Sequence, residues 1–232
     1  MEKFLISIAS IIVFLGVMRI LGVYGVYTVS TPSMEPNLGV GKYIIGTKLK
    51  SPKVNDVVTY RSVQLVKVIK EQNERRRRAT DFDSKSIFTS RIVAKGGDQV
   101  ELKNGVIFLN GEKNEPNDFM LKYSIGEEAY LKLNKRVLPQ REFYPQRIRD
   151  SILIDLSQKE IKMLQEFVEV NQHKRSNSIN IFGNENWTYG NYGPIEIPAQ
   201  HFFLVSDNRY AAMDSRVHGF VHEDEIVNVI LN

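Results

Sequence analysis

A serine between two prolines is the first candidate for chemistry in this sequence. Ser33 lies within residues 30–38, with Pro32 directly before it and Pro36 three residues after it. Prolines fix the local φ angle and push the residue before them toward extended geometry. We therefore expect Ser33 on a rigid, non-helical segment, as a nucleophile requires. The alternative is an ordinary Ser-Pro turn in a linker.

The composition limits the other chemistries that this chain can perform. With 232 residues, of which 42% are hydrophobic, it can bury a core as one domain with an insertion or as two small ones. The absence of cysteine excludes disulfides, a cysteine nucleophile and a cysteine zinc site. The four histidines lack a spacing typical of metal ligands, so we expect no metal and no other cofactor. The net charge of +4 suits an anionic membrane surface no worse than a nucleic acid.

An apolar segment precedes the serine. Residues 4–18 carry no charge, Arg19 interrupts the run, and residues 20–29 continue it. A bilayer needs about 20 residues, so the span is long enough if Arg19 snorkels to one interface. We expect residues 1–28 to be an uncleaved single-pass transmembrane helix in the plasma (inner) membrane, with the rest of the chain on the outer side. A cleavable signal peptide is the alternative, because the apolar core is short.

Short runs of β-branched and aromatic residues follow the serine. They predict strands at residues 42–48, 56–60, 63–70, 87–95 and 201–205. As a strand, residues 63–70 would place Leu65, Lys67 and Ile69 on one face. Two Asn-Gly pairs, Asn104-Gly105 and Asn110-Gly111, are typical of tight hairpin turns. The fold class is therefore mainly β, as an antiparallel sheet or a partly closed barrel.

The composition becomes charged and irregular over residues 112–187. Ser157 and Glu160 have the spacing of a capping box, which predicts a helix that continues to about Val170. We interpret this region as an inserted subdomain that contains α-helix. It would separate the two parts of the β core, residues 29–111 and 188–232.

Three separated motifs, in this order along the chain, resemble those of the type I signal peptidases. They are Ser33-Met34-Glu35-Pro36, then Arg91 with Gly97-Asp98, and then Ser206-Asp207-Asn208-Arg209 followed by Asp214-Ser215-Arg216. The family's late motif begins Gly-Asp-Asn-Arg, so Ser206 takes the place of its glycine. The resemblance implies a membrane-anchored serine endopeptidase with an antiparallel β domain of signal-peptidase type. Its partners would be the lipid bilayer and exported preproteins with small residues before the cut, and not nucleic acid.

The resemblance also implies roles for individual residues. Ser33 would be the nucleophile, and its own backbone N–H together with the Thr31 hydroxyl would form the oxyanion hole. The charged residues of the two later motifs would form a buried structural ionic network, made of Arg91, Asp207, Asp214 and Arg216.

The general base is where the chain departs from the family. The family's lysine stands directly before an arginine, and here Ser90 stands before Arg91. The serine that holds the lysine amine in many members is Ala212 here. Without a base Ser33 is an ordinary hydroxyl, since general-base help is worth about 10²–10⁴-fold. Lys67 is one candidate for a replacement base, and His218 with an aspartate is another.

Two functions from different classes follow. The first is an active signal peptidase, with a dedicated maturation peptidase for one exported substrate class as a variant. The second is a catalytically inactive or impaired relative that binds signal-peptide segments or assists a second, active signal peptidase. The retained Ser33 motif favours the first, and Ser90 favours the second.

Overall fold

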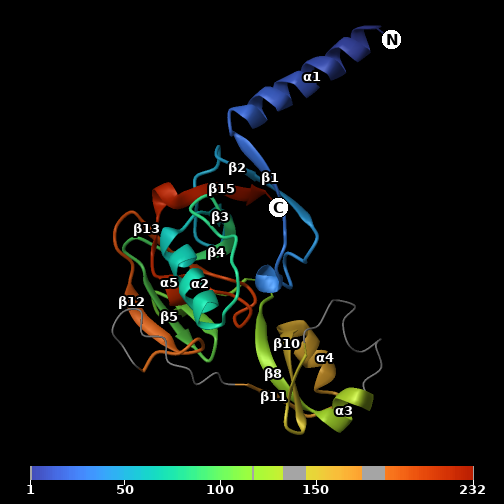
Figure 1. Ribbon diagram of the computed structural model, residues 1–232, viewed down its shortest axis with the longest axis vertical. Coiled ribbons are helices and arrows are strands. Elements are labelled where there is room, and N and C mark those ends of the chain that lie inside the picture. The colour runs from blue at the N-terminus through green and yellow to red at the C-terminus, as the bar shows by residue number, and fades with distance from the viewer. Residues whose placement is uncertain (1, 117, 133–144, 174–185, 232) are drawn as a thin grey trace.

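The computed structural model describes residues 2–116, 118–132, 145–173 and 186–231 of the chain (Figure 1). Within these residues the strands form three sheets whose neighbouring strands are antiparallel. This confirms the prediction of a mainly antiparallel β fold. In Figure 1 a long N-terminal helix extends away from the sheets at one end, and the third sheet lies at the other end.

The first sheet has seven strands and carries the parts of the chain nearest Ser33. Its order is β1 (Tyr24–Thr28), β2 (Tyr43–Thr47), β15 (Ile226–Leu231), β3 (Val57–Tyr60), β4 (Phe88–Lys95), β13 (His201–Val205) and β14 (Val221–His222). Short helical segments join some of them, namely η1 (Pro32–Met34), α2 (Val63–Arg75), α5 (Ser215–His218) and η2 (Glu223–Glu225). The N-terminal and C-terminal parts of the chain are therefore interleaved in one sheet.

Strand β4 is buried on both of its faces. On one side Val93 packs with the second sheet, and on the other Ile92 packs with Leu65 and Ile69 of α2. Helix α2 therefore covers one face of the first sheet, as Figure 1 also shows. A side chain on β4 is held in a fixed position because close-packed neighbours surround the strand.

The second sheet contains the two hairpin turns predicted from the Asn-Gly pairs. Its order is β12 (Tyr192–Glu196), β5 (Gln99–Lys103), β6 (Val106–Leu109) and β7 (Glu112–Lys113). Asn104 and Gly105 have φ angles of 51° and 83°, and Asn110 and Gly111 have 51° and 86°. Positive φ at both central residues is the requirement of a type I′ turn, which Asn-Gly satisfies at low cost. The hairpin predicted at Asn104-Gly105 is confirmed, and Asn110-Gly111, which was expected to end that hairpin, turns the chain into β7.

The third sheet lies within the region predicted as an insertion. Its order is β11 (Val170–Gln172), β8 (Met120–Gly126), β10 (Ser151–Ser157) and β9 (Gln146–Ile148), with α3 (Glu127–Lys132) and α4 (Gln158–Leu164) beside it. The capping box of Ser157 and Glu160 is present at the start of α4. The helix ends earlier than predicted, because Val170 already pairs with Ile125 of β8. Residues 117, 133–144 and 174–185 of the predicted insertion lie outside the described residues.

One predicted strand is wrong, since residues 63–70 belong to helix α2. The Ser62 side chain caps this helix by accepting a hydrogen bond from the Leu65 N–H at 3.2 Å. Leu65, Val66 and Ile69 form its buried face, while Lys67 is exposed. Their spacing fits a helix as well as an alternating strand, and the N-cap decides between the two.

The apolar N-terminal segment also differs from the expectation. Helix α1 (Glu2–Ile20) ends before the second apolar run, and Gly22 at a φ of 69° lets the chain turn. The next residues form β1, which pairs with β2 instead of extending the helix. In α1 the apolar side chains are exposed, among them Phe4 and Phe14. Among the residues that the structure describes, no helix has the length and apolarity that a membrane crossing requires.

Candidate active site

A cleft of about 610 Å³ brings the predicted nucleophile and the place of the missing base together. It is lined by parts of β1, η1, β3, α2, β4 and the segment after β13. Ser33 and Ser90 both line it, and η1 lies next to β4. Every described residue in its lining is uncharged at neutral pH, and no histidine is among them.

Ser33 lies on a single turn of 3-10 helix, so the expectation of a wholly non-helical segment is wrong in detail. Pro32 occupies the first position of this turn, where its missing N–H costs nothing. Thr31 precedes it in extended geometry, and its Oγ1 lies 3.0 Å from Ser33 Oγ. The Ser33 carbonyl accepts a hydrogen bond of 2.9 Å from the Asn208 N–H. The nucleophile motif and the late motif are therefore tied together through the backbone.

Ser90 is a buried hydroxyl on β4 at the wall of the same cleft. Its side chain is held by Ser206, whose Oγ lies 3.0 Å away, and both residues are 2% exposed. Ser206 stands where the family's late motif has glycine, so the two departures from the family face one another. The sequence alone does not indicate this pairing, because only the fold brings β4 and the end of β13 together.

Ala212 stands at the position of the residue that holds the base in the family, and Lys67 is a candidate to replace the base. The structure places these two residues differently. Ala212 lines the cleft, as the resemblance implied for the residue beside the base. Lys67 is exposed on α2 and does not line the cleft. The geometry therefore does not favour Lys67 as a replacement base.

Tyr60 and His218 form a buried polar pair that sequence reasoning did not join. The Tyr60 hydroxyl interacts with Ser90 and lies 3.4 Å from His218 Nε2, and Tyr60 lines the cleft. Burial raises the pKa of Tyr60. Burial also lowers the pKa of His218 to about 4, although the Asp214 carboxylate acts in the opposite direction. Both side chains are therefore neutral at pH 7.

The four residues of the predicted ionic network form two ion pairs, of which Arg91–Asp207 is partly buried and Arg216–Asp214 is fully buried. Arg91 donates to both oxygens of Asp207 at 2.8 and 2.6 Å. Arg216 donates to both oxygens of Asp214 at 2.8 and 2.7 Å, and neither of these two is exposed. Burial acts to raise the pKa of Asp214, but Arg216 and the Ser206 N–H outweigh it, so this pKa is lowered. None of these four charged residues lines the cleft.

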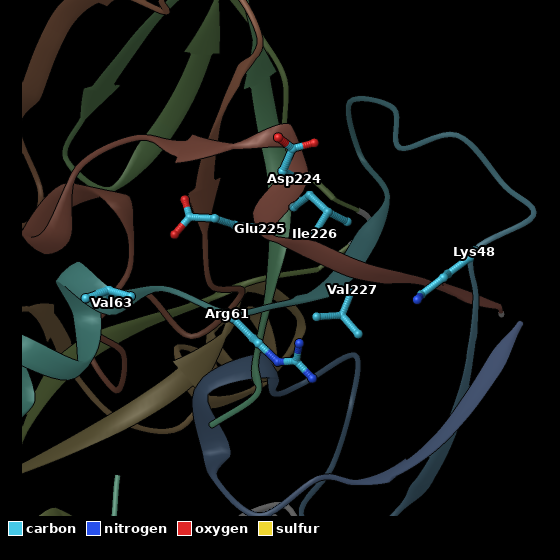
Figure 2. Close-up of a pocket in the computed structure, with 7 residues that line it drawn as sticks. All are labelled: Lys48, Arg61, Val63, Asp224, Glu225, Ile226 and Val227. Carbon is cyan, nitrogen blue, oxygen red and sulfur yellow. The ribbon is translucent and has the colours of Figure 1, made fainter. Parts of the chain in front are cut away.

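A second, smaller cavity of about 310 Å³ lies near the start of α2 and η2 (Figure 2). Figure 2 shows its charged side chains, Lys48, Arg61, Asp224 and Glu225, pointing in different directions. It contains no hydroxyl nucleophile. Within the described part of the chain, no group of three or more His, Asp or Glu residues could hold a metal ion.

Comparison with known proteins gives consistent matches. A family model described as "Signal peptidase, peptidase S26" matches residues 1–231. The chain is 26% identical over 145 residues to signal peptidase I of Bacillus amyloliquefaciens, a match that covers 62% of this chain and 47% of that protein. It is 28% identical over 99 residues to thylakoidal processing peptidase 1 of Arabidopsis thaliana, covering 41% of this chain and 26% of that protein. The chain thus spans half or less of the length of these curated relatives.

Among solved structures, the chain resembles a signal peptidase I from Enterococcus faecalis V583, with a TM-score of 0.35 and 18% identity. That likeness covers 78% of this chain and 98% of the other. The family model, in contrast, extends over nearly every residue of the chain, including the three motifs and the residues that line the cleft. The chain belongs to the signal peptidase family, peptidase S26.

Proposed function

We propose that this chain is a membrane-associated serine endopeptidase that removes N-terminal signal peptides from exported preproteins, with Ser33 as its nucleophile. One observation carries the proposal: the Ser33 and Thr31 hydroxyls lie 3.0 Å apart on the wall of a cleft large enough for a peptide segment. The family's activity is the reason to assign that cleft to a peptide bond. Ser33 attacks the carbonyl carbon, and an ester with the N-terminal part of the substrate forms.

The cleft supports a substrate segment without charge. Its lining combines apolar side chains, such as Val29 and Met213, with uncharged hydroxyls and amides. A charged side chain in this lining would lose its hydration without gaining an ionic partner. Small uncharged residues before the cut, as the resemblance implies, fit these surroundings.

The oxyanion hole is formed by groups that already lie at Ser33. The Thr31 hydroxyl, which now lies against Ser33 Oγ, can rotate to donate toward the oxygen that becomes negative. The backbone N–H of Ser33 is the second donor. Removal of one such donor typically costs about 3 kcal/mol of transition-state stabilisation.

Membrane association is proposed from helix α1. Its apolar side chains are exposed along its length, and it extends away from the sheets in Figure 1. Contact with lipid would remove this apolar surface from water. A membrane contact at α1 would keep Ser33 close to the bilayer surface, where signal peptides emerge.

The second candidate is a relative that binds signal-peptide segments without cutting them, or that assists an active peptidase. Two observations support this second candidate. The lysine position holds a buried serine that is already hydrogen-bonded to Ser206, and the described cleft lining contains no amine. A cleft with a nucleophile but no efficient base can still bind its substrate.

Cleavage and binding by the full-length protein separate the two candidates. We would incubate the wild type, Ser33→Ala and the control Ser84→Ala in liposomes with a preprotein that has small residues before its cut. Ser84 is exposed and outside the cleft. We expect slow release of the signal peptide by the wild type and the control, and none by Ser33→Ala. Crosslinking of the preprotein without cleavage in all three would support the second candidate, and neither binding nor cleavage would refute both.

A further inference from the structure

We propose that Ser90, Tyr60 and His218 form a proton relay that replaces the missing amine, with His218 as the final proton acceptor for Ser33. This inference rests on the proposed peptidase function. It gives the buried polar residues behind the cleft a role that the family motifs do not assign.

The polar groups of the relay lead from the wall of the cleft to a buried imidazole. Ser90 and Tyr60 line the same cleft as Ser33, and the Ser90 side chain interacts with the Tyr60 hydroxyl. The next step, from Tyr60 Oη to His218 Nε2, spans 3.4 Å. This distance exceeds that of an ordinary hydrogen bond by a few tenths of an ångström, and catalytic hydrogen bonds often shorten when the substrate binds.

His218 presents a ring nitrogen to the relay in a buried position. It is 4% exposed, its Nε2 faces Tyr60, and its Nδ1 has no hydrogen-bond partner among the described residues. The Asp214 carboxylate at the start of α5 favours the protonated ring electrostatically. An imidazolium formed here therefore has a carboxylate nearby, although it is removed from water.

Among the described residues on the elements around His218, the charged groups are paired with one another, act on Tyr60 or lie on the exposed side. On its own helix Arg216 is already paired with Asp214, and from β3 the facing group is Tyr60. Glu225 of η2 acts electrostatically on Tyr60. Helix α2 packs against α5 and buries Leu65, Val66 and Ile69, while its charged side chains lie on the exposed side.

Ser206 supports the relay as a positioning residue. Its hydroxyl lies 3.0 Å from Ser90 Oγ, and its backbone N–H donates to Asp214 at 3.0 Å. It therefore links Ser90 to the carboxylate that acts on His218, and it restricts the rotation of Ser90. A glycine at this position, as in the family motif, would leave the Ser90 hydroxyl without this partner.

The proton transfers balance without any further reactant. Ser33 Oγ bonds to the substrate carbonyl carbon while its proton passes to Ser90, directly or through one water. Ser90 passes its own proton to Tyr60, and Tyr60 passes its own to His218 Nε2. The reverse sequence delivers one proton to the leaving nitrogen as the C–N bond breaks. Water then hydrolyses the ester by the same route, so the relay ends in its initial state.

The test is the pH dependence of preprotein cleavage by the full-length protein. We would measure kcat/KM from pH 4 to 9 for the wild type, His218→Gln, Tyr60→Phe and the control Tyr192→Phe. Tyr192 is also a buried tyrosine but lies outside the cleft. We expect the wild type and the control to remain active until the pH falls toward 4. We expect the two relay variants to lose about 10²-fold in kcat and to lose this acid limb.

The outcomes separate the relay from the proposed function. If cleavage depends on Ser33 while both relay variants keep the wild-type rate and pH profile, the relay is wrong and the peptidase assignment stands. If the wild type shows no cleavage that depends on Ser33, both fall. A lower melting temperature with an unchanged pH profile would show that His218 is only structural. Should His218→Gln fail to fold, Ser90→Ala breaks the relay at a smaller side chain and decides the question.

Discussion

Restoring an amine at position 90 should turn slow cleavage into efficient cleavage. The perturbation is Ser90→Lys combined with Ser206→Gly and Ala212→Ser. Removal of the Ser206 side chain makes room, because its hydroxyl now lies 3.0 Å from Ser90 Oγ. A serine at 212 returns a hydrogen-bond acceptor to the wall of the same cleft.

The size of the effect follows from the surroundings of the new amine. A lysine must be neutral to act as a base, so its pKa has to fall from about 10.4 to about 8. That shift corresponds to about 3 kcal/mol of desolvation, which is within the range known for buried lysines. Position 90 is 2% exposed, and the described cleft lining is uncharged. The site can therefore desolvate a lysine amine enough to lower its pKa by this amount. General bases are worth about 10²–10⁴-fold, and His218, with a pKa of about 4, should act at the low end. We therefore expect a gain of roughly 10²-fold at pH 8.

The assay is preprotein cleavage at pH 8 and pH 6 by the wild type, the triple variant and the triple variant with Ser33→Ala. A matched control carries Ser90→Met in place of Ser90→Lys, which fills the same space without an amine. The gain should be smaller at pH 6, where the lysine is protonated, and absent in the control and in the Ser33→Ala background. A triple variant that folds, binds the preprotein and shows no gain at any pH would refute this reasoning.

Three further predictions concern stability and location. Arg216→Met should destabilise the fold by about 3–5 kcal/mol, because it leaves Asp214 as an unpaired buried charge; denaturant unfolding at pH 7 measures this, and a loss under 1 kcal/mol would contradict it. The His218 pKa is about 4 in the folded state and about 6.5 in the unfolded chain, so the free energy of unfolding should not depend on His218 above pH 6.5 and should fall by up to about 3 kcal/mol on its account as the pH is lowered to 4. In His218→Gln this part of the loss of stability should disappear. An identical loss of stability in the variant would contradict the assignment. A chain that begins at Val23 keeps β1 and should lose sedimentation with liposomes, whereas the full-length chain sediments; equal sedimentation would exclude α1 as the membrane contact.

Local sequence signals predicted the elements whose geometry is determined locally. Asn104-Gly105 and the Ser157–Glu160 capping box depend on a few adjacent backbone groups, and both are present. Residues 63–70 were misassigned because apolar residues at 65, 66 and 69 fit both periodicities. In that segment the Ser62 N-cap is the local feature that distinguishes a helix from a strand.

The candidate site was predictable only where the resemblance supplied the order of its motifs. Ser33 and Ser90 line one cleft, as that order implied. The contact of Tyr60 with His218 could not be read from the sequence, because 158 positions separate them and the packing of α5 against the first sheet brings them together. A buried histidine beside a tyrosine also has no characteristic spacing along the chain.

The most direct test of the central claim is the detection of an ester on Ser33. Full-length protein would be mixed with excess preprotein, quenched in acid within one turnover, digested and analysed by mass spectrometry. We expect that the peptide containing Ser33 carries the mass of the substrate's N-terminal part, and that this adduct is absent in Ser33→Ala. Cleavage at the same rate in Ser33→Ala, or an adduct on a different residue, would contradict it.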